Sequence, residues 1–445
     1  MPPRTLTPLP RSSARAWTRR PEWAVDATRS RADIGIRLFR ITVVLYILVT
    51  VPRIHEVVPG VAYLRPGKLL VLPLIASALF ALPRWQLLSP LRTTTAKCVG
   101  VIVVLGAFSI PLGIWPTNST LFFANVLIPM LLLFVCTSAA FVDRETAKLC
   151  IIALVLSVGV DALYVLAGLA PLVAGRPYIG VGLGPNESAA LFVLAFPFAV
   201  AIGSGRGPMR WLGYVIAGLL AAGVMKTGSR GGVIGLAVVA LALIVRAGPR
   251  RRVTYLVAVA ICGLGAALTA DDTLIERIST MAHPHADYNV TDREGRLQVW
   301  TRGLGYMATH PVLGIGIDGF ETAEGVLSGK MNQGYGIRYT AAHNAFVQIG
   351  AELGVFGLCA FLVALWSAAQ ECRRVLRGAA RDRAEHGRLA DDESRLATAV
   401  LCALVGVATT GFFLSLAYHP MMFFALAACI GVGVGSPYTR RFSMP

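Results

Sequence analysis

The sequence predicts an all-α polytopic membrane protein with about twelve transmembrane helices and one large loop. Of its 445 residues, 55% are hydrophobic and only 15% are charged, whereas a soluble globular protein carries about 25% charged residues. Apolar runs of roughly 20 residues recur along almost the whole chain, and each is long enough to cross a bilayer. Because helices satisfy their own backbone polar groups in lipid without closing a barrel, we expect each run to be a helix.

The apolar runs also divide the chain into segments. A basic arm (1–37), rich in Arg and Pro, precedes the first run and is not typical of a cleavable leader; we expect it to be disordered and to rest on anionic lipid. Nine spans (38–270), a large loop (271–343), three more spans (344–435) and a short tail (436–445) follow. The expected spans are 38–54, 69–83, 97–115, 120–142, 148–171, 189–203, 211–226, 231–246, 253–270, 344–371, 396–417 and 420–435.

The connections between the runs alternate in charge. Every second one is rich in Arg or Lys, as in "VDRETAK", "GSGRGPMR" and "RAGPRRR", and both ends of the chain fall on the same side as these. Positive loops stay in the cytoplasm, so the pattern places both termini there and the large loop in the periplasm. The net charge of +17 is therefore explained by topology, and a nucleic-acid partner is not expected.

The external connections nevertheless carry cations that the orientation rule does not require. At this depth an arginine costs free energy unless it faces a cavity or an anionic partner. A lipid-linked diphosphate lies at the same depth, and the guanidinium fork matches phosphate oxygens; anchoring to lipid headgroups is the alternative for each residue. These cations are Arg53, Arg65, Lys68, Lys226, Arg230, Arg293, Arg296, Arg302 and Arg338.

Arg230 is the strongest candidate for anion binding among these cations. It lies in the tight turn "GSRGG" between two expected helices. The glycines allow a ligand to approach the backbone closely, and the following helix begins there with its positive dipole end.

The large external loop also contains residues that fit a catalytic role. About 70 residues is too long for an ordinary connector and indicates function. Within it, "RLQVWTRGLGYMA" places Leu297, Trp300, Leu304 and Met307 on one helical face, which we expect to lie against the bundle. His343 directly precedes the tenth span and is followed by Asn344. A histidine can remove a proton near neutral pH, although a capping or packing role explains this position equally well.

Several motifs of other chemistries are missing. The chain has no D-x-D pair that would hold a metal on a nucleotide diphosphate and no P-loop. Its 8 cysteines all lie in or at the ends of apolar runs without a C-x-x-C pair, so neither a disulfide framework nor a zinc site is expected. Chemistry on a diphosphate would then depend on arginine for charge neutralisation, with no metal and no cofactor.

Four stretches together resemble the O-antigen ligase and O-antigen polymerase superfamily of bacterial inner-membrane glycosyltransferases. They are "VPRIHEVVPGVAYLRPG", "VGLGPNESAALF", "KTGSRGGVIGL", and "GRLQVWTRGLGYMATHPVLGIGIDGF" followed by "AAHNAFVQIGAELGVFGL". In this order they cover the chain from 38 to 435. The resemblance implies a GT-C-like membrane architecture.

The resemblance also implies an activity and its residues. Such enzymes take a glycan from undecaprenyl diphosphate in the periplasm, without a metal, and the ligases pass it to lipid A–core with inversion. Arg230 and Arg296 would hold the diphosphate and His343 would be the general base. From the charge pattern we add Arg302, Arg338, Lys226 and Arg53 as substrate-binding residues, and we add Asn344 because it follows His343 at the start of the span.

Three other activities stay open. A polymerase uses the same donor with a lipid-linked acceptor, but one late loop followed by a His-Asn helix suits ligases better. Protein O-oligosaccharyltransferases of the superfamily usually have a longer C-terminal region. A lipid-linked sugar transporter would show repeated halves and charge within the membrane. Asp161 and Glu352 are the main acidic residues within the spans, and we expect Glu352 to pair with an arginine.

Overall fold

The computed structural model describes residues 22–57, 60–180, 183–248, 252–253, 255–256, 295–328, 339–383 and 387–440. Most of the expected span 253–270, most of the large loop, Arg293 and Arg338 lie outside these ranges. The first helix begins at Glu22, so the end of the expected arm is helical.

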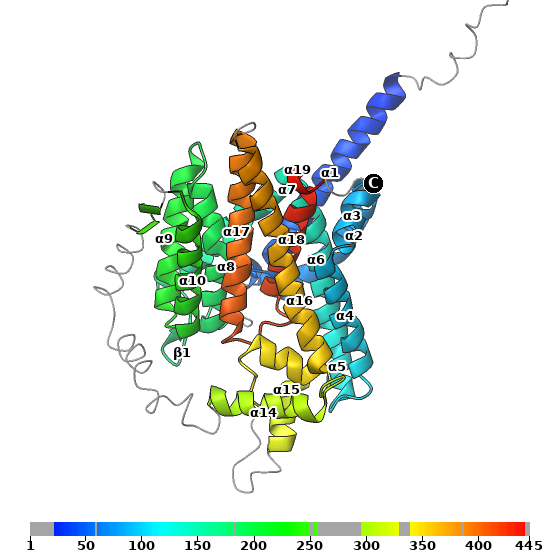
Figure 1. Ribbon diagram of the computed structural model, residues 1–445, viewed down its shortest axis with the longest axis vertical. Helices are drawn as coiled ribbons and strands as arrows, with labels where there is room; N and C mark the ends of the chain where they lie inside the picture. The colour runs from blue at the N-terminus through cyan, green and yellow to red at the C-terminus, as the bar shows by residue number, and fades with distance from the viewer. Residues whose placement is uncertain are drawn as a thin grey trace, which may run out of the picture.

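The described chain is a bundle of helices (Figure 1). Apart from 253–270, every expected span contains a helix. The helices are α1 (Glu22–Thr50), α2 (Pro66–Ala81), α3 (Arg84–Leu91), α4 (Thr94–Ser109), α5 (Pro116–Phe122), α6 (Ile128–Val142), α7 (Arg144–Leu166), α8 (Pro185–Gly203), α9 (Met209–Lys226), α10 (Arg230–Arg246), α14 (Arg296–Thr309), α15 (Phe320–Ala323), α16 (Ala345–Asp382), α17 (Gly387–Gly411), α18 (Pro420–Gly435) and α19 (Pro437–Arg440).

Short elements connect them. Single-turn helices η1 (Ile54–Glu56) and η2 (Val61–Leu64) follow α1, π-helical turns η3 (Phe123–Leu127) and η5 (Glu324–Ser328) join α5 to α6 and extend α15, and strands β1 (Leu172–Val173) and β2 (Arg176–Pro177) form a hairpin.

Six of the described helical segments are long and apolar enough to cross a membrane. A seventh span results if α2 and α3, which meet at 110°, form one broken span, and α4 and α18 are shorter apolar helices. The chain is therefore a multi-pass all-α membrane protein, as predicted. The number twelve and the GT-C likeness stay predictions.

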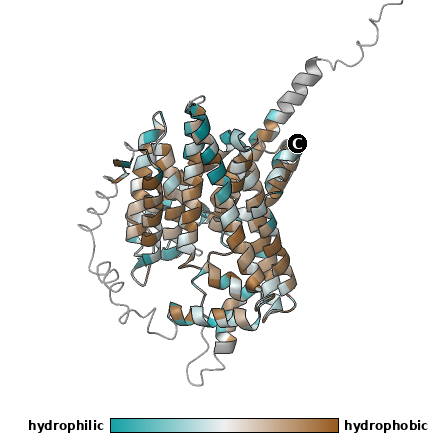
Figure 2. Ribbon diagram, in the orientation of Figure 1, coloured by the Kyte–Doolittle hydropathy of each residue, from teal (hydrophilic) through white to brown (hydrophobic). Residues whose placement is uncertain are grey.

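Helix α18 forms the centre of the bundle. It is apolar all round and packs against α6, α16 and α17, as expected of a helix without a polar face. The Phe424 ring meets those of Phe141 and Phe198 edge to face, with centroids 5.7 and 6.2 Å apart. The bundle is largely apolar along its length, with polar residues concentrated toward its ends (Figure 2).

Alternate connections lie at opposite ends of this bundle. The arginine-rich connections gather at the end that carries α3 and α19, whereas the β1–β2 hairpin, α5, α14 and α15 lie at the other end (Figure 1). A hydrogen bond of 2.9 Å from Arg395 to the Ser204 carbonyl joins two of the arginine-rich connections. The end with α14 is called the loop end below.

Helix α14 crosses the loop end, and only part of the face that the sequence predicted contacts the bundle. Val299 is 1% exposed and Gly303 is buried, whereas Leu297 and Leu304 are 46% and 52% exposed. A Cβ at position 303 would come within 2.4 Å of Val347, so the missing side chain lets α14 approach α16 closely. Of the four predicted residues, Trp300 and Met307 contact the bundle, at Phe412 and Gly350. The two leucines face outward instead, because close approach at Gly303 turns the helix away from them.

Glu352 also differs from its expected role. Its carboxylate accepts hydrogen bonds from the backbone N–H groups of Asp318 (3.2 Å) and Phe320 (3.3 Å). The expected partner was an arginine; instead this buried acid holds the backbone that leads from α14 to α15. The prediction failed because unpaired backbone groups of a buried loop need acceptors as much as a cation does.

Candidate active site

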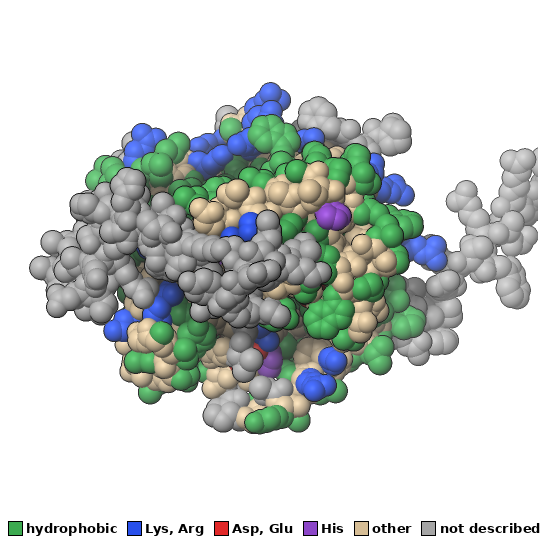
Figure 3. Space-filling model, turned by 90° about the horizontal axis from the view of Figure 1, so that it is seen from below, with side chains coloured by type: hydrophobic (Ala, Val, Ile, Leu, Met, Phe, Trp, Pro, Cys, Tyr) green, Lys and Arg blue, Asp and Glu red, His purple; other side chains and the backbone are tan. Residues whose placement is uncertain are grey.

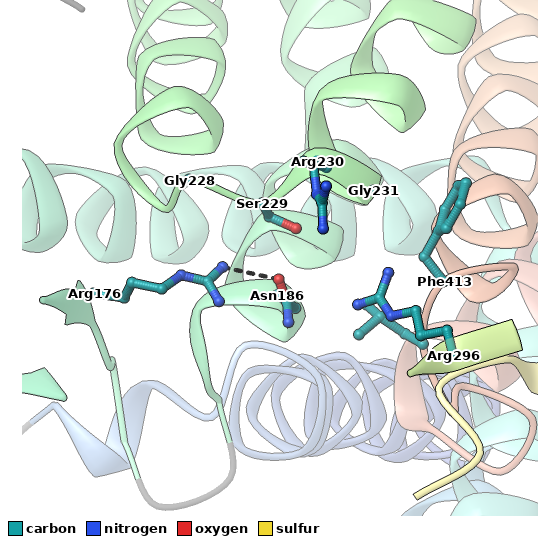
Figure 4. Close-up of a pocket in the computed structure, with 9 residues that line it drawn as sticks. Arg176, Asn186, Gly228, Ser229, Arg230, Gly231, Arg296 and Phe413 are labelled. Carbon is teal, nitrogen blue, oxygen red and sulfur yellow. Dashed lines mark hydrogen bonds between the residues drawn. The ribbon is translucent and has the colours of Figure 1, made fainter. Parts of the chain in front are cut away.

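Arginines from three separate elements line one pocket at the loop end. Arg176 comes from strand β2, Arg230 from the start of α10 and Arg296 from the start of α14. The pocket contains about 410 Å³ of empty space, partly open to solvent, and its remaining lining residues are Asn186, Gly228, Ser229, Gly231, Phe413 and Leu414. The side chains of Arg230 and Arg296 point into the same space, with Arg176 on the opposite side and Asn186 between (Figure 4). Two of the three predicted catalytic residues, Arg230 and Arg296, thus line one pocket.

The turn before α10 explains the position of Arg230. Ser229 caps the helix by accepting a hydrogen bond of 3.2 Å from the Gly232 N–H. Gly231 and Gly232 leave no room for side chains, since a Cβ would come within 2.9 Å of Phe413 and 2.5 Å of Ala189, respectively. The turn is therefore packed tightly between α8 and the chain after α17, and it holds Arg230 at the positive end of the α10 dipole.

Arg296 reaches the pocket because α14 is fixed along its length. The indole N–H of Trp300 donates to the Ala342 carbonyl at 3.0 Å. Arg302, one of the predicted substrate-binding residues, donates from Nε to both carboxylate oxygens of Glu324 at 2.9 Å, and Tyr306 donates to the same carboxylate at 2.8 Å. Arg302 does not line the pocket; it secures the helix that carries Arg296.

Replacing Glu324 with alanine is expected to destabilise the protein by about 3–5 kcal/mol, because it removes the buried carboxylate that accepts the hydrogen bonds of Arg302 and Tyr306. Glu324 is 3% exposed and the Arg302 side chain is 24% exposed, so the pair is largely shielded from water. The measurement is the unfolding midpoint of the purified protein in detergent. Glu145→Ala, which breaks the exposed Glu145–Lys148 pair, is the control and should change stability by less than about 1 kcal/mol. Equal shifts in the two variants would contradict the role of the pair.

His343 lies beside the pocket and is oriented through its backbone. Its φ is 48°, a left-handed conformation, and its N–H donates to Ser415 Oγ at 2.9 Å. Ser415 directly follows the pocket residues Phe413 and Leu414. Burial, followed by the positive charge of Arg296, lowers the pKa of His343 below its usual value. The imidazole is therefore neutral near pH 7 and able to accept a proton.

Asn344 has a structural role. It is 2% exposed, and its side-chain oxygen accepts hydrogen bonds from the N–H groups of Phe346 (2.9 Å) and Val347 (3.1 Å). These bonds cap α16. The capping role considered for His343 from the sequence thus belongs to its neighbour.

The other predicted site residues lie elsewhere. Lys226 is exposed at the end of α9, and Arg53 pairs with Glu56 at 2.6 Å; neither lines the pocket. Arg338 lies outside the described residues. Seen from the loop end, the described surface is mostly hydrophobic and neutral, with scattered Lys and Arg side chains (Figure 3).

Arg176 and Asn186 were not among the predicted site residues. Arg176 donates to the Thr227 carbonyl at 3.0 Å and to Asn186 Oδ1 at 2.9 Å, so it ties the hairpin to α8 and to the turn before α10. The sequence did contain an indication, because Arg176 is a further cation in an external connection. Within the described residues, no group of three or more His, Cys, Asp and Glu side chains is arranged to hold a metal ion.

Comparison with known proteins connects this site to a family. A family model described as O-antigen ligase matches residues 215–362, a segment that contains Arg230, Arg296 and His343. No curated protein matches the chain. The resemblance to the O-antigen ligase and polymerase superfamily is thereby confirmed, and the match implies a membrane enzyme that transfers lipid-linked glycans.

Proposed function

Given that residues 215–362 match the O-antigen ligase family, we propose that this protein is an O-antigen ligase. It transfers a glycan from undecaprenyl diphosphate to a sugar hydroxyl of lipid A–core and inverts the anomeric centre. The observation that carries the proposal is the convergence of Arg176, Arg230 and Arg296 on one pocket beside His343. Guanidinium groups carry the charge opposite to that of a diphosphate, and their paired N–H donors fit phosphate oxygens.

The proposed reaction is a single displacement. An acceptor hydroxyl gives up its proton to the neutral imidazole of His343, and its oxygen attacks the anomeric carbon from the face opposite the diphosphate. The bond between this carbon and the diphosphate oxygen breaks, and the electron pair leaves with the diphosphate. Arg230 and Arg296 stabilise the negative charge that develops on the leaving oxygen. In this mechanism the arginines supply the charge neutralisation, and the reaction needs no metal.

The proposal includes a location. The enzyme lies in the bacterial inner membrane with about twelve spans in a GT-C-like arrangement and with both termini in the cytoplasm. The loop end then faces the periplasm. Support comes from the gathering of the arginine-rich connections at the opposite end of the bundle (Figure 1), because positive loops stay in the cytoplasm.

In vitro transfer tests the function directly. Purified protein is supplied with an undecaprenyl-diphosphate glycan and lipid A–core, with EDTA present, and the products are separated by gel and mass. We expect glycan on lipid A–core. Lengthening of the lipid-linked glycan would instead identify a polymerase, and transfer to a protein acceptor an O-oligosaccharyltransferase. Movement of the glycolipid across vesicles without any product would favour a transporter.

A further inference from the structure

The pocket has two distinct sides. Arg296 and Phe413 lie on one side and Arg176 on the other, with Asn186 between them (Figure 4). His343 belongs to the Arg296 side, because the charge of Arg296 acts on its pKa and because its N–H contacts Ser415, which follows Phe413 and Leu414. A general base must reach the acceptor hydroxyl at the anomeric carbon. If the proposed function holds, the sugar end of the donor therefore lies on the Arg296 side.

The lipid end must then leave on the other side, where Arg176 lies on the β1–β2 hairpin. Val173 pairs with Arg176 and Leu172 with Pro177 across a two-residue turn, Ala174–Gly175, in which both residues have positive φ. This tight turn keeps β1 directly beside the arginine. Arg176 in turn is held by the Thr227 carbonyl and by Asn186, so the hairpin is fixed to the rim of the pocket.

The hairpin is unusually apolar for an exposed loop. Leu169, Leu172 and Val173 are 66%, 68% and 53% exposed. The preceding helix α7 also exposes apolar side chains, including Val160 and Leu163 at 51% and 53%. Exposed apolar side chains therefore lie on the same hairpin as the pocket residue Arg176.

We propose that this hairpin strip, Leu169, Leu172 and Val173, is the docking surface for the first isoprene units of the donor lipid. The diphosphate then spans the pocket from Arg176 to Arg296, with its sugar toward His343 and its lipid chain over the hairpin. The occupant is apolar, is attached to a dianionic group and lies at the depth of the membrane end. The positively charged pocket fits the diphosphate of the donor, and the exposed apolar residues of the hairpin fit its lipid chain.

Two donors with the same glycan diphosphate, one esterified to undecaprenol and one esterified to a methyl group, test this orientation. The variant Leu172→Ser/Val173→Ser is expected to raise KM for the undecaprenyl donor about tenfold and for the methyl donor less than about twofold, because the methyl donor has no isoprene units to bury on the hairpin. Leu172→Met/Val173→Leu, which keeps the strip apolar, should restore the wild-type KM. Leu112→Ser/Leu304→Ser replaces two residues at the loop end that are 71% and 52% exposed and should leave both KM values unchanged.

Three results would overturn the inference. Equal loss with both donors would show that the hairpin only positions Arg176. Unchanged KM values in the serine variant would show that ordinary bilayer lipid covers the strip. The same chain-length effect in the Leu112/Leu304 variant would show a general lipid requirement. Failure of the wild-type protein to use any lipid-diphosphate donor is a separate outcome, because it contradicts the proposed function itself.

Discussion

Replacing Arg230 with alanine is expected to lower kcat for glycan transfer about 10²–10³-fold. The diphosphate gains negative charge on its leaving oxygen as the glycosidic bond breaks, and Arg230 lies at the positive end of α10 where this charge would form. An interaction that strengthens in the transition state affects kcat more than KM. Steady-state transfer kinetics with the undecaprenyl-diphosphate donor measure both constants.

Two further variants define what Arg230 contributes. Arg230→Lys keeps the charge but loses the two-pronged geometry, so we expect an activity between those of the wild type and Arg230→Ala. Arg65→Ala removes an exposed arginine from the same external side of the sequence and should retain full activity. A higher KM with unchanged kcat in Arg230→Ala would contradict the leaving-group role and leave only ground-state binding.

Replacing His343 with glutamine is expected to lower transfer about 10²–10⁴-fold, the usual contribution of a general base. In the wild type, kcat/KM should fall as the pH drops through the pKa of His343, because only the neutral imidazole accepts a proton. Burial and Arg296 lower this pKa, so the acid limb of the profile should lie below pH 6.5, the ordinary histidine value. His310→Gln, at an exposed histidine after α14, is the control and should retain the wild-type profile.

A second variant tests whether the charge of Arg296 lowers the pKa of His343. Arg296→Gln removes the positive charge that disfavours the imidazolium, so the acid limb of the remaining activity should move to higher pH. Because kcat/KM reports the free enzyme, the shift does not depend on bound diphosphate. An unchanged acid limb in Arg296→Gln, or a wild-type profile in His343→Gln, would exclude His343 as the titrating base.

The positions of the helices could be predicted from the hydrophobic pattern of the sequence, but the roles of several residues near the site could not. Apolar runs located a helix in every expected span that the structure describes, because span length depends only on bilayer thickness. The turn "GSRGG" likewise revealed Arg230, since a tight glycine turn before a helix is a local feature. The roles of Arg302 and Asn344 could not be assigned in this way. Arg302 binds Glu324, and Asn344 binds the α16 backbone. Both partners compete with a ligand for these side chains, and only the folded structure brings them into contact.

The sequence by itself determined that this chain is a multi-pass helical membrane protein, and it revealed the resemblance to a glycan-transfer family. Hydrophobicity, charge alternation and short motifs are properties of neighbouring residues, so they can be read along the chain. Only the tertiary structure decided that Arg176, Arg230 and Arg296 share one pocket and that α14 turns Gly303 toward α16. Those arrangements depend on which surfaces of distant segments fit together, and close packing is a property of the whole bundle.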